Sequence, residues 1–186
     1  MGRPVPRPFL RNAWLNLTTI VPTTASHRRS YAERYSRYME RTTEQPIIAD
    51  TSGLVSLVTD TDHNHLPATK AAAALRKTSR PILLPHDVYV ETINILGKKS
   101  GHETASKAAS ELLHPDSQFL LIDTHTSLIT ALEKFKDQPS GVSLTDCIVM
   151  AVADDYGTKD IFGFDKQFED AGYKRLEPST EWKQVA

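Results

Sequence analysis

From residue 46 onward, short apolar runs alternate with longer segments in which apolar residues recur at helical spacing. Short apolar runs bounded by proline or turn-forming residues are typical of buried strands. Four such runs predict strands, at residues 47–49, 81–85, 119–122 and 161–164. A weaker run at residues 173–176 predicts a fifth strand at the edge of the sheet.

The segments between these runs predict helices, several of which follow a Ser, Thr or Asp that can cap a helix. Thr51 or Ser52 is the expected cap of the first one. The predicted helices cover residues 53–58, 67–77, 88–98, 103–113, 124–135, 147–156 and 166–170. Strands that alternate with helices predict βαβ units, and therefore an α/β fold whose parallel sheet has helices on both faces.

The chain of 186 residues is long enough for one domain with a full core, which we place at residues 46–180. Residues 1–45 differ in charge: they hold eight arginines and three glutamates, a net charge of +5, whereas the rest of the chain has a net charge of −6. Three interpretations of this proline- and arginine-rich segment stay open. It is a basic arm for nucleic acid or a partner, an organelle transit peptide, or the product of a start assigned ahead of a true start at Met39.

Hydropathy and cysteine content bear on the cellular compartment in which the protein is expected. No run approaches the ~18 apolar residues of a membrane span, so we expect no membrane segment. Cys147 is the only cysteine, which rules out a disulfide framework within the chain and favours a reducing compartment such as the cytoplasm.

Acidic residues recur where the predicted strands end. Asp50 follows the first strand, Asp165 follows the fourth, and Asp146 lies in the first turn of the helix after Ser143. Glu91 lies about one turn into the helix after the second strand. Because parallel strands end at one edge of the sheet, where ligands bind, we expect these four carboxylates to meet there.

Four carboxylates at one place would raise one another's pKa unless a cation neutralised them. Mg²⁺ and Mn²⁺ prefer oxygen ligands, and such ions activate water and stabilise charge on a phosphate during transfer. The sequence therefore predicts a divalent metal site that hydrolyses a phosphodiester.

The motifs that carry these acids, in their order along the chain, resemble those of the PIN domain family, and in particular its small VapC-type toxin ribonucleases. The motifs are Ile-Ala-Asp-Thr-Ser at residues 48–52, Val-Glu at 90–91, Ser-Leu-Thr-Asp at 143–146 and Gly-Phe-Asp-Lys-Gln-Phe at 163–168. The resemblance covers residues 46–176 and leaves out the N-terminal segment. The last motif differs from the family pattern because it lacks a second acid, which leaves the number of metal ions open.

The resemblance implies a three-layer α/β/α sandwich with a mostly parallel sheet of four to five strands. It makes Asp50, Glu91, Asp146 and Asp165 the catalytic and metal-binding acids, with Ser52 and Ser143 as supporting polar residues. It implies a Mg²⁺- or Mn²⁺-dependent endoribonuclease, the toxin of a type II toxin–antitoxin pair. Such a toxin forms a homodimer, cuts RNA and is held inactive by a small antitoxin whose tail fills the active-site groove.

Three lysines could contact RNA phosphates beside this site, namely Lys98, Lys99 and Lys166, although lone lysines are commonly ordinary surface residues. His63 and His65, in a turn-rich loop with Asp62, are interpreted as capping and solvent-facing residues because no further ligand completes a zinc site. Cys147 is interpreted as a core residue.

Two other functions stay open. One is a phosphatase of the haloacid dehalogenase type with Asp50 as nucleophile, although Ser52 stands where that family has a second Asp. The other is a PIN-like scaffold that binds RNA or protein and has little or no catalytic activity. Each acid taken alone could also serve only as a helix cap or a first-turn residue.

Overall fold

The computed structural model describes residues 44–78 and 80–175. The N-terminal segment with its three interpretations, and the residues from 176 onward, lie outside the described residues. Within the described part, none of the helices combines the length and apolar character needed to cross a membrane.

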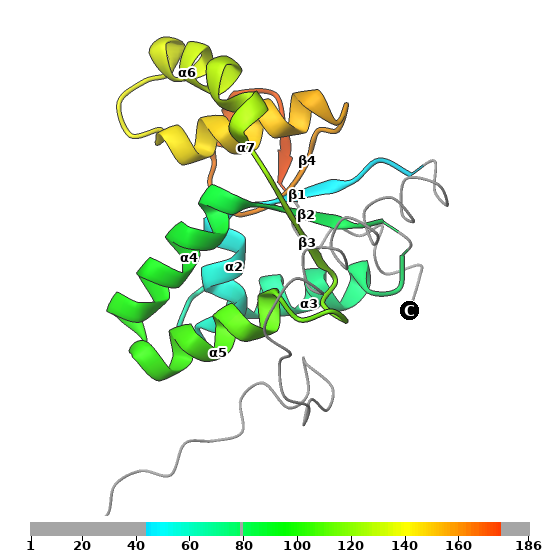
Figure 1. The fold of residues 1–186 in the computed structure, drawn as a ribbon, viewed down its shortest axis with the longest axis vertical. Coiled ribbons are helices and arrows are strands. Elements are labelled where there is room, and N and C mark those ends of the chain that lie inside the picture. The colour runs from blue at the N-terminus through cyan, green and yellow to red at the C-terminus, as the bar shows by residue number, and fades with distance from the viewer. Residues whose placement is uncertain (1–43, 79, 176–186) are drawn as a thin grey trace, which may run out of the picture.

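Five parallel strands form a single sheet in the order β3-β2-β1-β4-β5 (Figure 1). They are β1 (Ile47–Ala49), β2 (Ile82–Pro85), β3 (Phe119–Ile122), β4 (Asp160–Phe162) and β5 (Lys174–Arg175). The register places Ile48 beside Leu83 on one side and Ile161 on the other, so β1 is the central strand. The predicted edge position of the fifth strand is confirmed.

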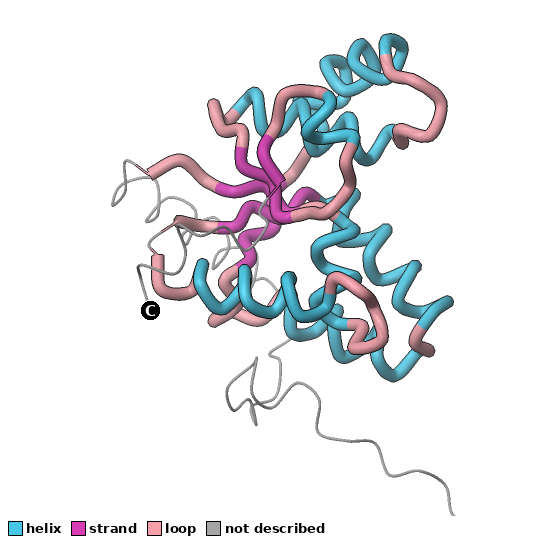
Figure 2. Tube along the Cα trace, turned by 180° about the vertical axis from the view of Figure 1, so that it is seen from behind, coloured by secondary structure: helices cyan, strands magenta, loops and turns pink. Residues whose placement is uncertain are grey.

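Helices cover both faces of this sheet, as Figures 1 and 2 show from opposite sides. The α6–α7 pair lies on one face, and the other helices from α2 to α5 lie on the other face. The helices are α2 (Thr51–Val58), α3 (His65–Leu75), α4 (His86–Lys99), α5 (His102–Leu112), α6 (Leu128–Asp137), α7 (Leu144–Asp155) and the short α8 (Gln167–Asp170). The predicted three-layer α/β/α architecture is confirmed.

The core centres on β1 and α7. All three residues of β1 are fully buried, as expected for a strand covered on both faces. In α7 every residue from 146 to 153 is buried, which accounts for the nearly continuous apolar sequence of this helix. Cys147 is part of this core, as its sequence context predicts.

The fourth strand is shorter than predicted. Its ladder ends at Phe162, whose carbonyl accepts a hydrogen bond from the Asp50 N–H at 3.0 Å. The next backbone groups bond to side chains instead: the Phe164 N–H donates to Ser52 Oγ at 2.9 Å, and the Phe164 carbonyl accepts from Arg175 at 2.6 Å. Asp165 therefore lies in a loop beyond the strand.

The helix after the third strand is also different from the prediction. A 3-10 turn, His125–Ser127, precedes α6, so the α-helix begins at Leu128. The Asp123 carboxylate accepts a hydrogen bond from the His125 N–H at 2.8 Å, which stabilises a turn at the end of β3.

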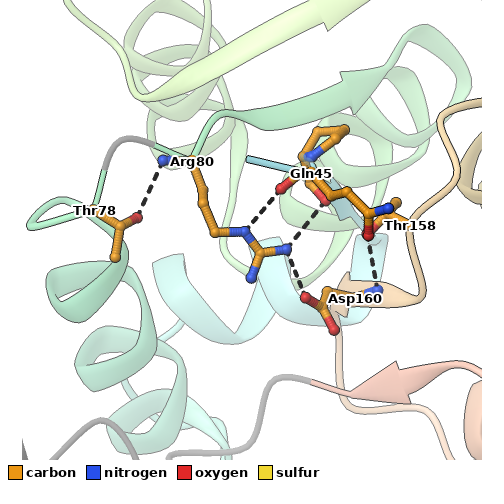
Figure 3. A network of polar contacts seen from close by, with 6 residues as sticks. Gln45, Thr78, Arg80, Thr158 and Asp160 are labelled. Carbon is orange, nitrogen blue, oxygen red and sulfur yellow. Dashed lines mark hydrogen bonds and ion pairs between the residues drawn. The ribbon is translucent and has the colours of Figure 1, made fainter. Parts of the chain in front are cut away.

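At the amino ends of the strands, Arg80 links the starts of three strands (Figure 3). Its guanidinium donates to the carbonyls of Gln45 and Pro46, at 2.8 and 3.3 Å, and pairs with Asp160 at 2.5 Å. The side chains of Arg80 and Asp160 are both mostly buried. These contacts link the amino ends of β1, β2 and β4, whereas the acids lie near the carboxyl ends of the strands.

Helix α2 lies against the end of β4 without room for a side chain. A Cβ on Gly53 would lie 2.3 Å from the Phe162 carbonyl oxygen and 2.8 Å from a ring carbon of the same residue. Glycine is therefore required at this position so that the helix can start directly after β1.

We expect Gly53→Ala to lower the free energy of unfolding by about 1–3 kcal/mol, because the Phe162 carbonyl is held by Asp50 and cannot move aside. Gly97→Ala is the matched control, since a Cβ there would lie 3.9 Å from its nearest neighbour, the Ala105 side chain. This second change should raise stability by about 0.5–1 kcal/mol, because alanine favours a helix. Urea unfolding measures both, and equal effects would contradict the requirement for glycine.

Candidate active site

Asp50 is placed by the junction between β1 and α2. The residue is the N-cap of α2, so the helix begins at Thr51, two residues earlier than predicted, and neither Thr51 nor Ser52 is the cap. Asp50 Oδ2 accepts hydrogen bonds from the Ser52 N–H at 2.9 Å and from Ser52 Oγ at 2.6 Å. The cap interpretation of Asp50 therefore describes its hydrogen bonds, and a further role depends on its neighbours.

The loop after β4 passes directly over the Asp50 carboxylate. A Cβ on Gly163 would lie 2.8 Å from Asp50 Cβ and 2.9 Å from Asp50 Oδ2. Ser52 links the two segments, because its hydroxyl donates to Asp50 and accepts from the Phe164 N–H at 2.9 Å. Asp165 is thereby brought to the end of β1.

Asp146 is placed by the start of α7. Ser143 and Asp146 form a capping box, in which Ser143 Oγ accepts from the Asp146 N–H at 3.1 Å and Asp146 Oδ2 accepts from the Ser143 N–H at 2.6 Å. These reciprocal bonds stabilise the first turn of the helix and hold the carboxylate at the carboxyl edge of the sheet.

Glu91 is placed by α4, which begins directly after β2. Its Oε2 accepts a hydrogen bond from Thr51 Oγ1 at 3.0 Å. The first turn of α2 therefore contacts two of the predicted acids: Ser52 contacts Asp50, and Thr51 contacts Glu91.

These elements border one groove of about 480 Å³. Glu91, Asp146 and Asp165 all line it, whereas Asp50 is 1% exposed and lies beneath the loop at Gly163. The remaining lining residues are mostly polar and come from α2, the loop after it, α4, the segment before α7 and the start of α8: Thr51, Ser52, Val55, Ser56, Asp62, His63, Asn64, Ile95, Lys99, Gly141, Ser143 and Gln167.

Only one of the three lysines predicted to contact RNA lines this groove. Lys99 is the only lysine or arginine of the described residues in the lining. Glu91, Ile95 and Lys99 are spaced by four residues on α4, so they follow one face of the helix along the groove. Lys98 and Lys166, both described, are not part of the lining.

The acids influence one another electrostatically. The pKa of the Asp50 carboxyl is raised from 3.8 to about 7, mainly by burial; the hydrogen bonds from Ser52 oppose this rise, and the charges of Asp165 and Asp146 add to it. Burial also raises the pKa of Asp165, with Asp146 and Glu91 adding to the effect and Arg175 opposing it. The structure thus links all four predicted acids electrostatically: Asp50 and Asp146 interact with each other and with Asp165, which also interacts with Glu91.

This donor set fits a hard divalent cation. Its ligand atoms are carboxylate oxygens, and burial of Asp50 beside two further acids is a charge arrangement that a cation would relieve. As the side chains stand, no three His, Cys, Asp or Glu groups of the described residues enclose a metal position. Hydrogen bonds engage one oxygen each of Asp50, Glu91 and Asp146.

The histidine loop has structural contacts. Asp62 Oδ1 accepts from Ser56 Oγ at 3.0 Å and from the Asn64 N–H at 2.9 Å, which stabilises the turn. His65 Nδ1 lies 2.9 Å from the Ser56 carbonyl oxygen. These contacts agree with the capping interpretation of the loop.

Sequence reasoning assigned no role in the site to three of the residues that shape it: Thr51, Gly163 and Arg175. A glycine directly after an apolar strand was a readable sign of a close backbone approach. Nothing in the local sequence marks Thr51 as a partner of Glu91, 40 residues away, or Arg175 as a partner of the loop at Phe164.

We expect Asp50→Asn to stabilise the metal-free protein at pH 8 and to leave its stability almost unchanged at pH 4. A folded pKa of about 7 against 3.8 means that the folded state binds the proton more tightly. The stability that this proton provides is complete below about pH 4 and is lost as the pH rises through 7, by roughly 4 kcal/mol if the whole shift is expressed. Asparagine removes this dependence and is an equally favoured cap.

Thermal unfolding in EDTA across this pH range measures the difference between wild type and variant. Parallel curves for the two proteins would contradict the raised pKa of Asp50. Asp170→Asn, an exposed acid outside the groove, serves as the control and should follow the wild type at every pH.

Comparison with known proteins agrees with this geometry. The chain's fold is similar to that of Mycobacterium tuberculosis VapC20, a toxin described as cleaving the sarcin-ricin loop, with a TM-score of 0.63, 22% identity, and coverage of 71% of this chain and 99% of that one. None of the curated proteins matches the chain. The profile of the PIN domain family matches residues 47–173, which include strands β1 to β4 and the four acids. The chain therefore belongs to the PIN domain family.

Proposed function

We propose that this protein is a metal-dependent endoribonuclease and the toxin of a type II toxin–antitoxin pair. The observation that carries the proposal is that Glu91, Asp146 and Asp165 line one groove with Asp50 buried beside them, in a PIN domain whose fold is similar to that of an RNA-cleaving toxin. The proposed substrate is RNA, and the proposed reaction is hydrolysis of a phosphodiester bond.

In this proposal Asp50, Asp146 and Asp165 would hold Mg²⁺ or Mn²⁺, with Glu91 contributing a direct or water-mediated contact. When bound, such a cation would activate water and neutralise charge on the phosphate. Ser52 and Ser143 orient the Asp50 and Asp146 carboxylates through the hydrogen bonds described above. Thr51 does the same for Glu91, so each of these three acids has a fixed partner before any substrate arrives.

Lys99 is the proposed phosphate contact on the substrate. Eight residues of α4 separate it from Glu91, a rise of about 12 Å. At that distance Lys99 would contact a phosphate other than the one that is cut. Lys99 is thus the one lysine or arginine among the described lining residues that could pair with a phosphate in this otherwise acidic groove.

A small antitoxin is the proposed regulatory partner. The acids that line the groove would attract a basic side chain of that partner, which would occupy the place of the metal and of the RNA.

A second copy of the chain is the proposed partner at α6. Five of the seven exposed large apolar residues of the described part lie on α6 and at the start of α7: Leu128, Ile129, Leu132, Phe135 and Leu144. Glu133, Lys136 and Asp137 flank this stripe with charges of both signs, so two copies related by a two-fold axis can pair unlike charges around an apolar centre.

We expect purified protein to cleave an RNA pool with Mn²⁺, and we expect EDTA or Asp146→Asn to reduce the rate at least 100-fold. Asparagine keeps an acceptor for the Ser143 N–H, so the capping box persists while the charge is lost. Asp170→Asn is the control and should cleave like the wild type. The 100-fold figure corresponds to about 2.7 kcal/mol in the barrier.

Three results would count against the proposal. Cleavage that persists in Asp146→Asn would point to a different site. Absence of both cleavage and Mn²⁺-dependent thermal stabilisation would favour the alternative of a PIN-like scaffold that binds RNA or protein without cutting. Cleavage that is unaffected by EDTA would contradict the metal requirement.

We further expect Lys99→Gln to raise the KM for RNA and to lower the slope of log KM against log salt by about 0.7, the value for one lost phosphate contact on a single strand. Lys98→Gln is the matched control, because the neighbouring lysine lies outside the groove lining. Steady-state cleavage at several salt concentrations measures both variants. Equal changes in the two would show that only the net charge matters.

A further inference from the structure

Arg175, the last described residue of the edge strand β5, reaches back to the loop that carries Asp165. Its Nη1 donates to the Phe164 carbonyl oxygen at 2.6 Å, and its Nη2 donates to Glu169 Oε2 at 2.8 Å. The Arg175 side chain is 17% exposed, and its contact with the Phe164 carbonyl is partly buried, whereas its contact with Glu169 is exposed to solvent.

The Phe164 backbone is therefore held from two sides. Its N–H donates to Ser52 Oγ at 2.9 Å, and its carbonyl accepts from Arg175. The next residue is Asp165, whose own carbonyl accepts from the Phe168 N–H at 3.3 Å at the start of α8. The peptide before Asp165 and the turn after it are both anchored, so the backbone that carries the Asp165 side chain is held in place.

Arginine suits this role because its planar guanidinium donates along two directions at once. One direction holds the loop and the other pairs with the helix that follows it. A lysine has the charge but lacks this fork. The last motif contributes a single acid, so the placement of that acid depends on this contact more than it would in a motif with two.

We propose that Arg175 is a positioning residue for the acid site: it holds the Phe164 carbonyl so that Asp165 faces the groove together with Asp146 and Glu91. This inference rests on the proposed metal-dependent function. Arg175 is not part of the groove lining, so its effect passes through Asp165 and not through contact with RNA.

The test is Mn²⁺ binding to the full-length chain, followed by the loss of the free-ion signal in electron paramagnetic resonance. Arg175→Gln should weaken binding about 10- to 100-fold, the range found when a partner of a metal ligand is removed. Arg175→Lys should lose less. Lys174→Gln removes the same charge from the adjacent, exposed position of β5 and should bind Mn²⁺ like the wild type.

Two further measurements separate positioning from simple stabilisation. Thermal unfolding in EDTA reports the structural part alone, and a merely structural contact would lower this temperature without changing Mn²⁺ affinity in the folded protein. Cleavage at saturating Mn²⁺ should show a lower kcat with an unchanged KM for RNA. If Arg175→Gln does not fold, Arg175→Lys carries the test through the same readouts.

The outcomes separate the positioning role of Arg175 from the proposed function of the protein. If the wild type binds Mn²⁺ and the folded Arg175 variants bind it equally well, the positioning role is overturned and the proposed function stands. If the wild type binds no Mn²⁺, both are overturned. Weaker binding in Lys174→Gln, equal to that in Arg175→Gln, would also overturn positioning, because a general disturbance of β5, and not the contact with the Phe164 carbonyl, would then explain the loss.

Discussion

The close approach of α2 to the end of β4 is the constraint on which the rest of the site depends. Gly53 lets the helix touch the Phe162 carbonyl, and Gly163 lets the following loop cross the Asp50 carboxylate. Ser52 then bonds to both segments. Because no side chains lie between these segments, the loop that carries Asp165 packs directly on Asp50, although the two acids are 115 positions apart in the chain.

This close packing has an electrostatic cost for the folded protein. Asp50 is buried beside other acids, which raises its pKa, and its compensation within the chain is a pair of hydrogen bonds from Ser52. Structures commonly hold such strain at functional sites, where a ligand relieves it. A divalent cation and a phosphate would supply complementary charges here, so the feature that destabilises the folded protein is also the one that would make it a binding site.

The chain distributes the work of holding the acids among elements that are distant in sequence. The first turn of α2 contacts Asp50 and Glu91, the capping box of α7 orients Asp146, and the edge strand reaches Asp165 through Arg175. At the amino ends of the strands, Arg80 contacts the starts of three strands. The contacts of Arg80 thus lie at the amino ends of the strands, whereas the acids lie at the carboxyl ends.

The sequence by itself determined the alternation of strands and helices, the burial of β1 and α7, and the positions of Asp50 after the first strand and of Asp146 in the first turn of α7. These properties follow from hydrophobic periodicity and capping preferences, which are local. Only the tertiary structure decided that β4 stops at Phe162, that Lys99 rather than Lys98 or Lys166 enters the groove, and that Thr51 and Arg175 support the acids. Those facts depend on contacts between residues far apart in the chain, and no local pattern encodes which distant partner a side chain will meet.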